Sequence, residues 1–350
     1  MSSRTVNLAL LAILTVDALS GVGSFLAGTP DQGWILWVHR IGGFTLLPLL
    51  VWKAVIAVRS YRKRGLSTAT VLSGMLGVVF IASLLFGILW STSGAPGAEV
   101  PVLGSLTGLG VHVALAFALL PLFLVHVVLR WRQMRLRRPD FASRRAALRY
   151  LALSAAGLAA WRASEAGSAV AGWSGTSRRY TGSREAASFQ GNLFPATNWL
   201  TDLVPQIDPV TWRLRIYGAV PRETVIGWDE LRAYPSSTSR AVLDCTGGWY
   251  TEQDWSGVPL SVVLERAGVD PAARSVVVCS ATGYRRRYPL DEAGRLLLGT
   301  GVAGEPLAPG HGAPVRLIAP GRRGYDWVKW VVAVEVSDAP GWLQSPLPLQ

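Results

Sequence analysis

Residues 240–250 read Arg-Ala-Val-Leu-Asp-Cys-Thr-Gly-Gly-Trp-Tyr, a short apolar run that ends at a cysteine and continues into two glycines. The apolar run predicts a β-strand, and the glycines predict a turn directly after it. Cys245 therefore lies where the chain turns, and its sulfur can project into a cavity. A thiolate is a soft ligand that suits a transition metal, and a single cysteine leaves the other ligands to another source. The alternative is that Cys245 is a small buried hydrophobe.

The sequence around this strand predicts a mixed α+β, β-rich domain over residues 191–340. Short β-rich runs bounded by Pro and Gly predict further strands at residues 211–217, 275–280, 315–319 and 330–336. Helical stretches at residues 228–233 and 260–267 interrupt them. A linker at residues 173–190 precedes the domain and a tail at residues 341–350 follows it. Cys279, inside an apolar run, is expected to be buried.

The N-terminal part of the chain has a different character. Residues 6–27, 34–57, 68–90 and 106–129 are each apolar and close to the roughly 20 helical residues that cross a hydrocarbon core of about 30 Å. None of these runs alternates as a barrel strand does, so all are predicted to be helices. Residues 1–140 are therefore expected to form an all-α, four-helix transmembrane bundle in contact with lipid.

The net charge of +12 is concentrated in this membrane half: residues 1–172 hold 16 Lys and Arg against 5 Asp and Glu, whereas residues 173–350 hold 18 against 17. The excess lies in links at residues 59–64 and 130–149, while the links at 29–33 and 91–105 contain neither Lys nor Arg. This asymmetry places the N-terminus and the end of the fourth span in the cytoplasm. It also explains the charge without a nucleic-acid partner.

Residues 141–172 contain a basic stretch at 143–149 and a short apolar run at 150–161. The pair resembles a twin-arginine export signal placed inside the chain, with a possible cleavage site at residues 169–171. The alternative is a slightly short fifth helix with basic flanks. Both interpretations place residues 173–350 on the extracytoplasmic face of the cytoplasmic membrane.

Three of the four histidines lie within the predicted spans. His39 and His112 each lie about six residues from the outer end of their span, which is about 9 Å at 1.5 Å per residue. Two neutral imidazoles at one depth on different helices can supply both axial ligands of a haem b. The alternatives are histidines hydrogen-bonded between helices and the proton relay of a transporter.

His126 lies 14 residues after His112, a spacing that resembles that of two-haem b-type cytochromes. The position 14 residues after His39 is Lys53, so a second, inner haem would lack its expected partner. His126 is predicted either to bind a second haem or to lie at a membrane interface or quinone site.

Four further motifs accompany residues 244–250 and 254–260 (Asp-Trp-Ser-Gly-Val-Pro-Leu): residues 283–293, 304–307, 311–317 and 320–330. Their content and order resemble the sulfite oxidase family over roughly residues 190–340. The resemblance implies a molybdenum cofactor, in which a molybdopterin dithiolene supplies the remaining ligands and Cys245 is the protein ligand to molybdenum.

The same resemblance implies which residues hold the pterin or its phosphate. His311, Arg316 and Lys329 match cofactor-binding positions. The arginines of Gly321-Arg-Arg-Gly324 add the basic and backbone donors that a phosphate needs. The remaining candidates at the cofactor edge or beside the ligand are Phe194, Asn198, Asp244 and Thr246, with Arg322 and Arg323 as the two arginines.

The residues after the cysteine depart from the family pattern. Sulfite-binding members continue with Ala-Gly-Asn-Arg-Arg, which gives an arginine-lined anion pocket, whereas this chain has Thr-Gly-Gly-Trp-Tyr. Trp249 and Tyr250 indicate an aromatic wall over the metal, closer to periplasmic reductases that act on sulfoxides. Residues 285–287, all arginine, either restore positive charge or face water.

Together these features predict a membrane-bound molybdopterin oxidoreductase that transfers an oxygen atom to or from a small substrate. A membrane haem b would link it to the quinone pool. The rival hypotheses are a haem-bearing membrane sensor that binds a ligand without turnover and a proton-coupled transporter. Metal content separates the first rival from an enzyme, and the absence of a b-type haem band would favour the second.

Overall fold

The computed structural model describes residues 3–65, 68–92, 98–100, 104–134, 143–173, 178–198 and 202–348. The chain divides into two compact units: Met1–Ala98 with Leu106–Gly182, and Glu99–Ser105 with Ser183–Gln350. The division between Gly182 and Ser183 lies within the predicted linker at residues 173–190. The Tyr180 hydroxyl donates to the carbonyl of Gly28 (2.6 Å) and ties the end of the first unit to the helices.

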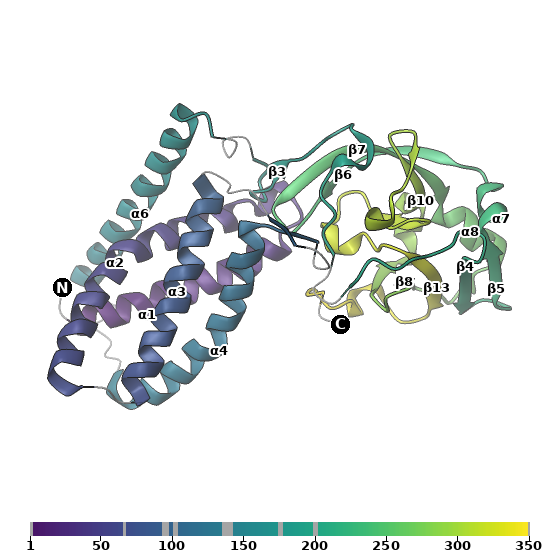
Figure 1. The fold of residues 1–350 in the computed structure, drawn as a ribbon. Helices are drawn as coiled ribbons and strands as arrows, with labels where there is room; N and C mark the ends of the chain where they lie inside the picture. Colours follow the sequence, from purple (N-terminus) through teal and green to yellow (C-terminus); the bar gives the residue numbers. More distant parts are fainter. Residues whose placement is uncertain are drawn as a thin grey trace. The chain divides into compact units, whose positions relative to one another are not determined.

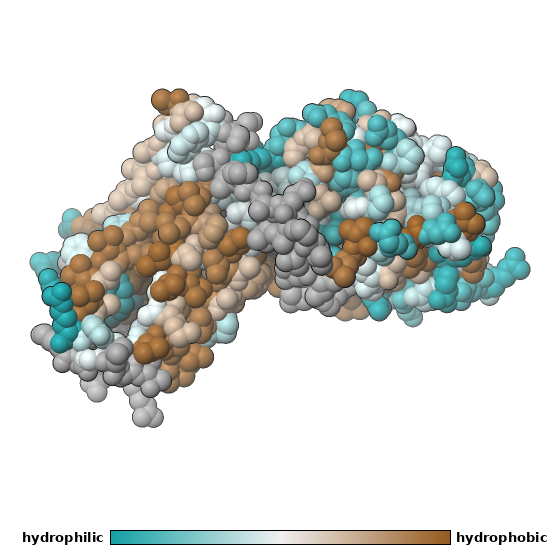
Figure 2. All heavy atoms as spheres, viewed as in Figure 1, coloured by the Kyte–Doolittle hydropathy of each residue, from teal (hydrophilic) through white to brown (hydrophobic). Residues whose placement is uncertain are grey.

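The first unit is helical (Figure 1). Four of its helices match the predicted spans, and each is long and apolar enough to cross a membrane. These helices are α1 (Ser3–Leu26), α2 (Trp34–Arg64), α3 (Thr68–Thr92) and α4 (Gly108–Met134). Helix α1 packs on α2, and α3 packs on α4. Apolar side chains also cover the face of this unit seen in Figure 2.

Helix α6 (Arg144–Val170) is longer than the predicted fifth segment. Its N-terminus is capped by Ser143, whose hydroxyl accepts the Ala146 N–H (3.2 Å). Helix α6 packs against α2, where Gly157 allows the close approach because a Cβ there would overlap Thr45. The helix is not among the four that are apolar enough to span a membrane.

The second unit is rich in sheet, as predicted, and its core lies between two sheets. One has the order β11-β10-β7-β3, with β12 on β10 and β6 on β7; the other has the order β5-β4-β13-β8-β9. Most neighbours are antiparallel, but β3–β7 and β4–β13 are parallel. The strands of the first sheet are β3 (Arg184–Glu185), β6 (Ser237–Asp244), β7 (Trp249–Pro259), β10 (Leu297–Val302), β11 (Glu305–Pro306) and β12 (Arg316–Ile318). Those of the second are β4 (Arg213–Gly218), β5 (Thr224–Gly227), β8 (Ser275–Ser280), β9 (Arg285–Pro289) and β13 (Val331–Ser337).

All five predicted strands are present, as β4, β6, β8, β12 and β13. The two predicted helices are α7 (Trp228–Arg232) and α8 (Leu260–Ala267). Strands β1 (Ala98–Val100) and β2 (Gly104–Leu106) pair in a separate two-stranded sheet. Cys279 on β8 was predicted to be buried. Strands β13 and β9 flank its backbone on both sides, but its side chain is only half-buried.

Candidate active site

Cys245 follows β6 directly and opens the turn that leads into β7. Its N–H donates to the Trp249 carbonyl (2.9 Å), and the Gly248 N–H donates to the Cys245 carbonyl (3.1 Å). Gly248 has a φ of +89°, a conformation that side chains disfavour, so the second glycine is what permits the turn. The Gly247 N–H donates to the Cys245 sulfur (3.3 Å). The strand-end position predicted for this cysteine is therefore present.

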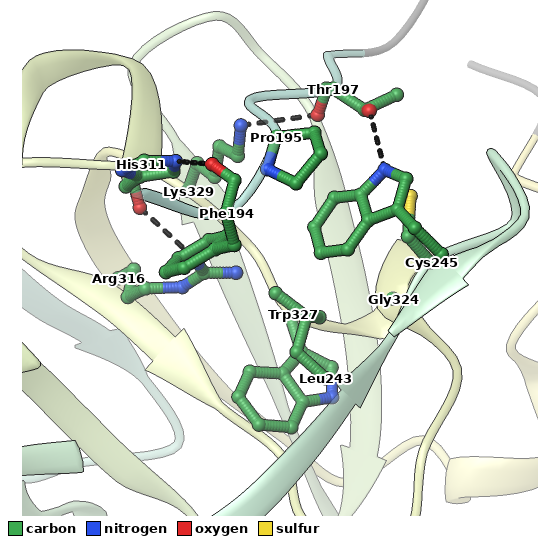
Figure 3. Close-up of a pocket in the computed structure, with 11 residues that line it drawn as sticks. Phe194, Pro195, Thr197, Leu243, Cys245, His311, Arg316, Gly324, Trp327 and Lys329 are labelled. Atoms are coloured by element: carbon green, nitrogen blue, oxygen red, sulfur yellow. Dashed lines mark hydrogen bonds between the residues drawn. The ribbon is translucent and has the colours of Figure 1, made fainter. Parts of the chain in front are cut away.

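The sulfur lies in a small cavity of about 40 Å³ inside the sheet-rich unit (Figure 3). This volume corresponds to only a few water molecules. It is lined by Phe194, Pro195, Thr197, Leu243, Cys245, Trp249, His311, Arg316, Gly324, Trp327 and Lys329. Five residues predicted from the sequence for this chemistry thus meet in one place: Phe194, Cys245, His311, Arg316 and Lys329.

Arg316 brings a buried positive charge to the cavity. Its side chain packs near the rings of Trp255 (5.1 Å) and Trp327 (5.6 Å), and Nη1 donates to the His311 carbonyl (3.1 Å). Its Nε is buried without a hydrogen-bond partner among the described residues. Burial lowers the pKa of Arg316 to about 9, an effect that a nearby anion would oppose.

Lys329 brings a second buried positive group. Its Nζ donates to the carbonyl of Thr197 (3.1 Å), Oδ1 of Asn198 (2.8 Å) and the carbonyl of Gly310 (2.6 Å). All three acceptors are neutral, so they satisfy its protons without balancing its charge. Burial, and then the charge of Arg316, lowers the pKa of Lys329 to about 7.

Two buried cations beside a thiol fit an anionic group bound at the cysteine. Burial raises the pKa of the Cys245 thiol, while the Gly247 N–H and the charges of Arg323 and Lys329 favour the thiolate. An anionic dithiolene bound at the thiolate would balance these positive charges, to which Asp202 already contributes a carboxylate near Lys329. The donor set therefore fits a molybdenum cofactor. The cavity has room for only the molybdenum end of that cofactor.

His311 holds the segment at residues 194–198 rather than facing the sulfur. Its Nε2 donates to the Phe194 carbonyl (2.9 Å), and its ring packs on the Phe194 ring with centroids 4.0 Å apart. Burial, followed by the charges of Arg316 and Lys329, lowers the pKa of His311 to about 4. The Nδ1 of His311 also lies 3.2 Å from Oδ1 of Asn192, so the ring connects residue 192 with the segment that covers the cavity.

The predicted phosphate donors at residues 322–323 are already engaged with carboxylates. Arg323 Nη1 donates to Asp244 Oδ1 (2.7 Å), and Arg322 Nη2 donates to both oxygens of Glu292 (2.7 and 2.6 Å). Both pairs span long stretches of sequence, which is why the motif alone did not show them. Neither arginine lines the cavity, and the role of both as phosphate donors stays a prediction.

The other predicted residues lie beside the cavity. Asp244 also accepts the Ser183 hydroxyl (2.7 Å), so its carboxylate joins three segments of chain. Asn198 acts through Lys329, and Thr246 is half-buried in the turn after the cysteine. Arg286, one of the three consecutive arginines, is buried in an ion pair with Asp326 (2.7 Å) and does not line the cavity.

Thr197 is a cavity residue that the sequence did not single out. Its hydroxyl accepts the indole N–H of Trp249 (3.1 Å), and its carbonyl accepts Lys329 (Figure 3). Trp249 itself is almost fully buried. This pair places two neutral hydrogen-bonding groups in the cavity that holds the sulfur.

In the helical unit, His39 of α2 and His112 of α4 lie together with ring centroids 5.9 Å apart. The Nδ1 of His39 donates to the Asp17 carbonyl (2.9 Å), and that of His112 donates to the Ser83 carbonyl (2.7 Å). Because a carbonyl only accepts, each Nδ1 carries the proton and each Nε2 keeps its lone pair. Ligating histidines commonly have this arrangement.

The spacing of the two rings fits a shared metal. A bond from a metal to an imidazole nitrogen is about 2 Å long, and that nitrogen lies about 1 Å from the centre of its ring. Two imidazoles that bind one metal from opposite sides therefore have ring centres about 6 Å apart. Each ring also packs on a glycine: a Cβ at Gly21 would lie 3.0 Å from His39, and one at Gly87 would lie 2.9 Å from His112. The observed pair fits the axial ligands of a haem.

The structure gives less support to a second haem at His126. The side chain at the expected partner position, Lys53, donates to Asn7 Oδ1 (2.7 Å). The position 14 residues after His39 therefore offers no imidazole, and the role of His126 stays a prediction.

Comparisons with known proteins agree with the geometry of the sheet-rich unit. Residues 201–343 match the family described as "Oxidoreductase molybdopterin binding domain". The chain is 29% identical over 167 residues to the uncharacterized oxidoreductase YuiH of Bacillus subtilis, covering 45% of this chain and 84% of that protein. It is 29% identical over 165 residues to the mitochondrial sulfite oxidase of Rattus norvegicus, covering 38% of this chain and 30% of that protein.

Among solved structures, the chain is similar to the sulfane dehydrogenase SoxCD of Paracoccus pantotrophus, with 29% identity and a TM-score of 0.38. This similarity covers 39% of this chain and 40% of that one. The sheet-rich unit carries a molybdopterin-binding oxidoreductase domain of the sulfite oxidase type, and the protein is an oxidoreductase.

Proposed function

We propose that this chain is a membrane-anchored molybdenum-cofactor oxidoreductase whose sheet-rich unit acts outside the cytoplasm. Its reaction would be oxygen-atom transfer on a small substrate, with reduction of a sulfoxide-like compound favoured over oxidation of sulfite. Electrons would be exchanged with the quinone pool through a haem b in the helical unit. The observation that carries the proposal is the buried cavity in which Cys245 meets two cations.

The cavity residues divide into groups that bind the cofactor and groups that hold the walls. Cys245 would ligate the molybdenum, and Arg316 would balance the negative charge of the cofactor with its unpartnered Nε. Lys329 and His311 hold the segment at residues 194–198 over the cavity through its carbonyls. When bound, the molybdenum centre supplies two-electron oxygen-atom-transfer chemistry, and the protein sets access to it.

The preference for a neutral oxo substrate comes from charge. With Arg316 assigned to the cofactor and Lys329 to the segment over the cavity, the described wall nearest the sulfur offers the Trp249 indole and the Thr197 hydroxyl. Neither group compensates a dianion such as sulfite, whose desolvation would then be costly. Sulfoxides and N-oxides are polar and uncharged overall, so they suit such a wall.

The membrane part of the proposal rests on the helical unit. Four helices have the length and composition of spans, and large apolar side chains such as Val78, Leu124 and Val128 are more than half exposed in the described unit. Exposed apolar surface of this kind fits a lipid environment. The basic links would keep the N-terminus in the cytoplasm, and residues 144–145 would begin a twin-arginine-like signal for export.

Metal analysis of the purified full chain tests the central proposal. Protein made in a molybdenum-replete host should contain about one molybdenum per chain, and Cys245→Ser should lose the metal. Cys279→Ser is the matched control, because Cys279 lies on β8 and does not line the cavity. Wild-type protein without molybdenum, or equal retention in both variants, would contradict the assignment.

Steady-state assays with an artificial electron donor or acceptor test the substrate class. Sulfoxides and N-oxides should be reduced with higher kcat/KM than nitrate, and sulfite should be oxidised poorly. Efficient turnover of sulfite with little reduction of sulfoxides would reverse the proposed preference. Reduced-minus-oxidised spectra test the haem: His39→Ala and His112→Ala should abolish a b-type band that His126→Ala retains.

A further inference from the structure

The two histidines proposed as haem ligands have different partners at Nδ1. His39 Nδ1 lies 2.9 Å from the carbonyl oxygen of Asp17 and 3.4 Å from its carboxylate Oδ1. His112 Nδ1 lies 2.7 Å from the carbonyl oxygen of Ser83 and 3.2 Å from its hydroxyl. Both Nδ1 atoms therefore donate to a backbone carbonyl. A carboxylate lies near Nδ1 of His39, whereas a hydroxyl lies near Nδ1 of His112.

Space for the Asp17 carboxylate is built into the bundle. The Asp17 side chain is 14% exposed, and its Oδ1 is buried with no hydrogen-bond partner among the described residues. A Cβ at Gly42 would overlap this oxygen, and Gly42 lies one turn after His39 on α2. The glycine thus leaves room for the carboxylate beside the histidine.

No lysine or arginine among the described residues forms an ion pair with this carboxylate. Asp17 is the only acidic residue among the first 30, and it lies inside an apolar helix where an ionisable group is costly. Arg40, the basic residue next to His39 in sequence, forms its ion pair with Glu165 of α6 (3.4 Å). Asp17 therefore faces the histidine rather than the arginine.

A carboxylate near the Nδ1–H of a ligating imidazole has two physical effects. It fixes the ring orientation and raises the basicity of the ligand. In its ionised form the carboxylate also stabilises the more oxidised, more positive state of the metal, and a medium of low dielectric strengthens that interaction. Ser83 provides the first effect to His112 but not the second.

We propose that Asp17 is the carboxylate partner of His39, which orients this ligand and lowers the reduction potential of the bound haem. The inference rests on the haem site of the proposed function. Asp17 is a positioning residue that acts through His39, and it touches neither the iron nor a substrate. The asymmetry between the ligands makes the α1–α2 side of the site the more electron-donating side.

Potentiometric titration of the haem in the purified full chain, at one fixed pH, tests this inference. Asp17→Asn should retain the b-type spectrum and raise the midpoint potential. The expected change is at least a tenfold larger equilibrium constant for one-electron reduction, which corresponds to about 59 mV. Asp31→Asn is the matched control, because it removes an exposed carboxylate from the α1–α2 connection and should leave the potential unchanged. Ser83→Ala should change the potential less than Asp17→Asn does.

An Asp17→Asn potential equal to that of Asp31→Asn, with haem retained, would overturn the inference. If Asp17→Asn lacks haem, recovery of haem and potential in Asp17→Glu would support it, and absence of recovery would overturn it. A wild-type chain without a b-type band would overturn the haem site itself, which separates that failure from failure of the Asp17 assignment.

Discussion

Two neighbouring arginines allow one stability prediction to be worked out with an internal control. Arg323 pairs with Asp244 at 2.7 Å, and each side chain is only 6% exposed. Arg322 pairs with Glu292 at 2.6 Å, but these side chains are 36% and 31% exposed. Removing one partner of a buried pair leaves an uncompensated charge and costs about 3–5 kcal/mol, whereas a solvent-accessible pair contributes about 0–1 kcal/mol.

Asp244→Asn should therefore lower the melting temperature much more than Glu292→Gln does. For a unit of this size about 1 kcal/mol corresponds to about 2–4 °C, so the expected decreases are roughly 6–20 °C and at most about 4 °C. The melts use tryptophan fluorescence of the full chain made without molybdate, so that cofactor binding does not add to stability. The double variant Asp244→Asn with Arg323→Met should recover most of the loss, because it removes the unpaired charge.

The same substitution should weaken cofactor retention. Gly324 packs against the Cys245 backbone, where a Cβ would come within 3.0 Å of the Cys245 Cα. The Arg323 pair holds this loop to the end of β6, so Asp244→Asn should reduce molybdenum per chain while Glu292→Gln should not. Equal melting temperatures and equal molybdenum contents in the two single variants would refute the reasoning.

Three further predictions concern the cavity and the helices. Trp249→Phe removes the hydrogen bond to Thr197 and should lower kcat/KM for sulfoxide reduction about 3- to 10-fold with molybdenum retained; an unchanged value would argue against the neutral wall. The pKa of Lys329 is about 7 in the folded protein, and its ordinary value is 10.5. Between these two pH values the unfolded chain therefore binds more protons at this lysine than the folded protein does. Stability of the cofactor-free protein should therefore rise with pH across that window, and the slope should decrease in Lys329→Met when denaturation is followed at several pH values. Gly87→Val should remove the b-type band, because its side chain would displace the α4 histidine, whereas Gly74→Val in the same helix meets nothing within 4 Å and should keep it.

The helices were predictable because one simple rule governs them. A long, predominantly apolar run has to satisfy its backbone within itself, so hydropathy alone located α1–α4. The sequence pattern did not predict strand β7, although it is the longest strand in the described chain. Its buried face includes Thr251 and Gln253, both fully buried, and Gln253 is accommodated by hydrogen bonds to Ala187 and Thr251. Polar residues on the inner face concealed the alternation that identifies a strand.

The sequence predicted those site residues whose side-chain type by itself suits metal or cofactor binding. A strand-end cysteine and a motif order pointed to Cys245, His311, Arg316 and Lys329. Thr197 acts through a carbonyl and a hydroxyl that only the fold brings to the cavity, so no sequence signal identifies it. Asp17 could have been noticed in the sequence, since an acidic residue inside an apolar helix indicates function. Only the packing of α1 on α2 shows that His39 is its partner.

Helix α6 shows how a signal-like sequence and a structural element can coincide. Its 27 residues are about 40 Å long, yet Arg162 and Glu165 interrupt its apolar character. Its apolar and small residues have a packing role, because Gly157 lets it approach Thr45 of α2, and Glu165 pairs with Arg40. These contacts all precede residue 171. Cleavage there would cut the chain between the helical and the sheet-rich units and leave these contacts of α6 with α2 intact, so the packing of α6 is compatible with both a fifth helix and a processed export signal.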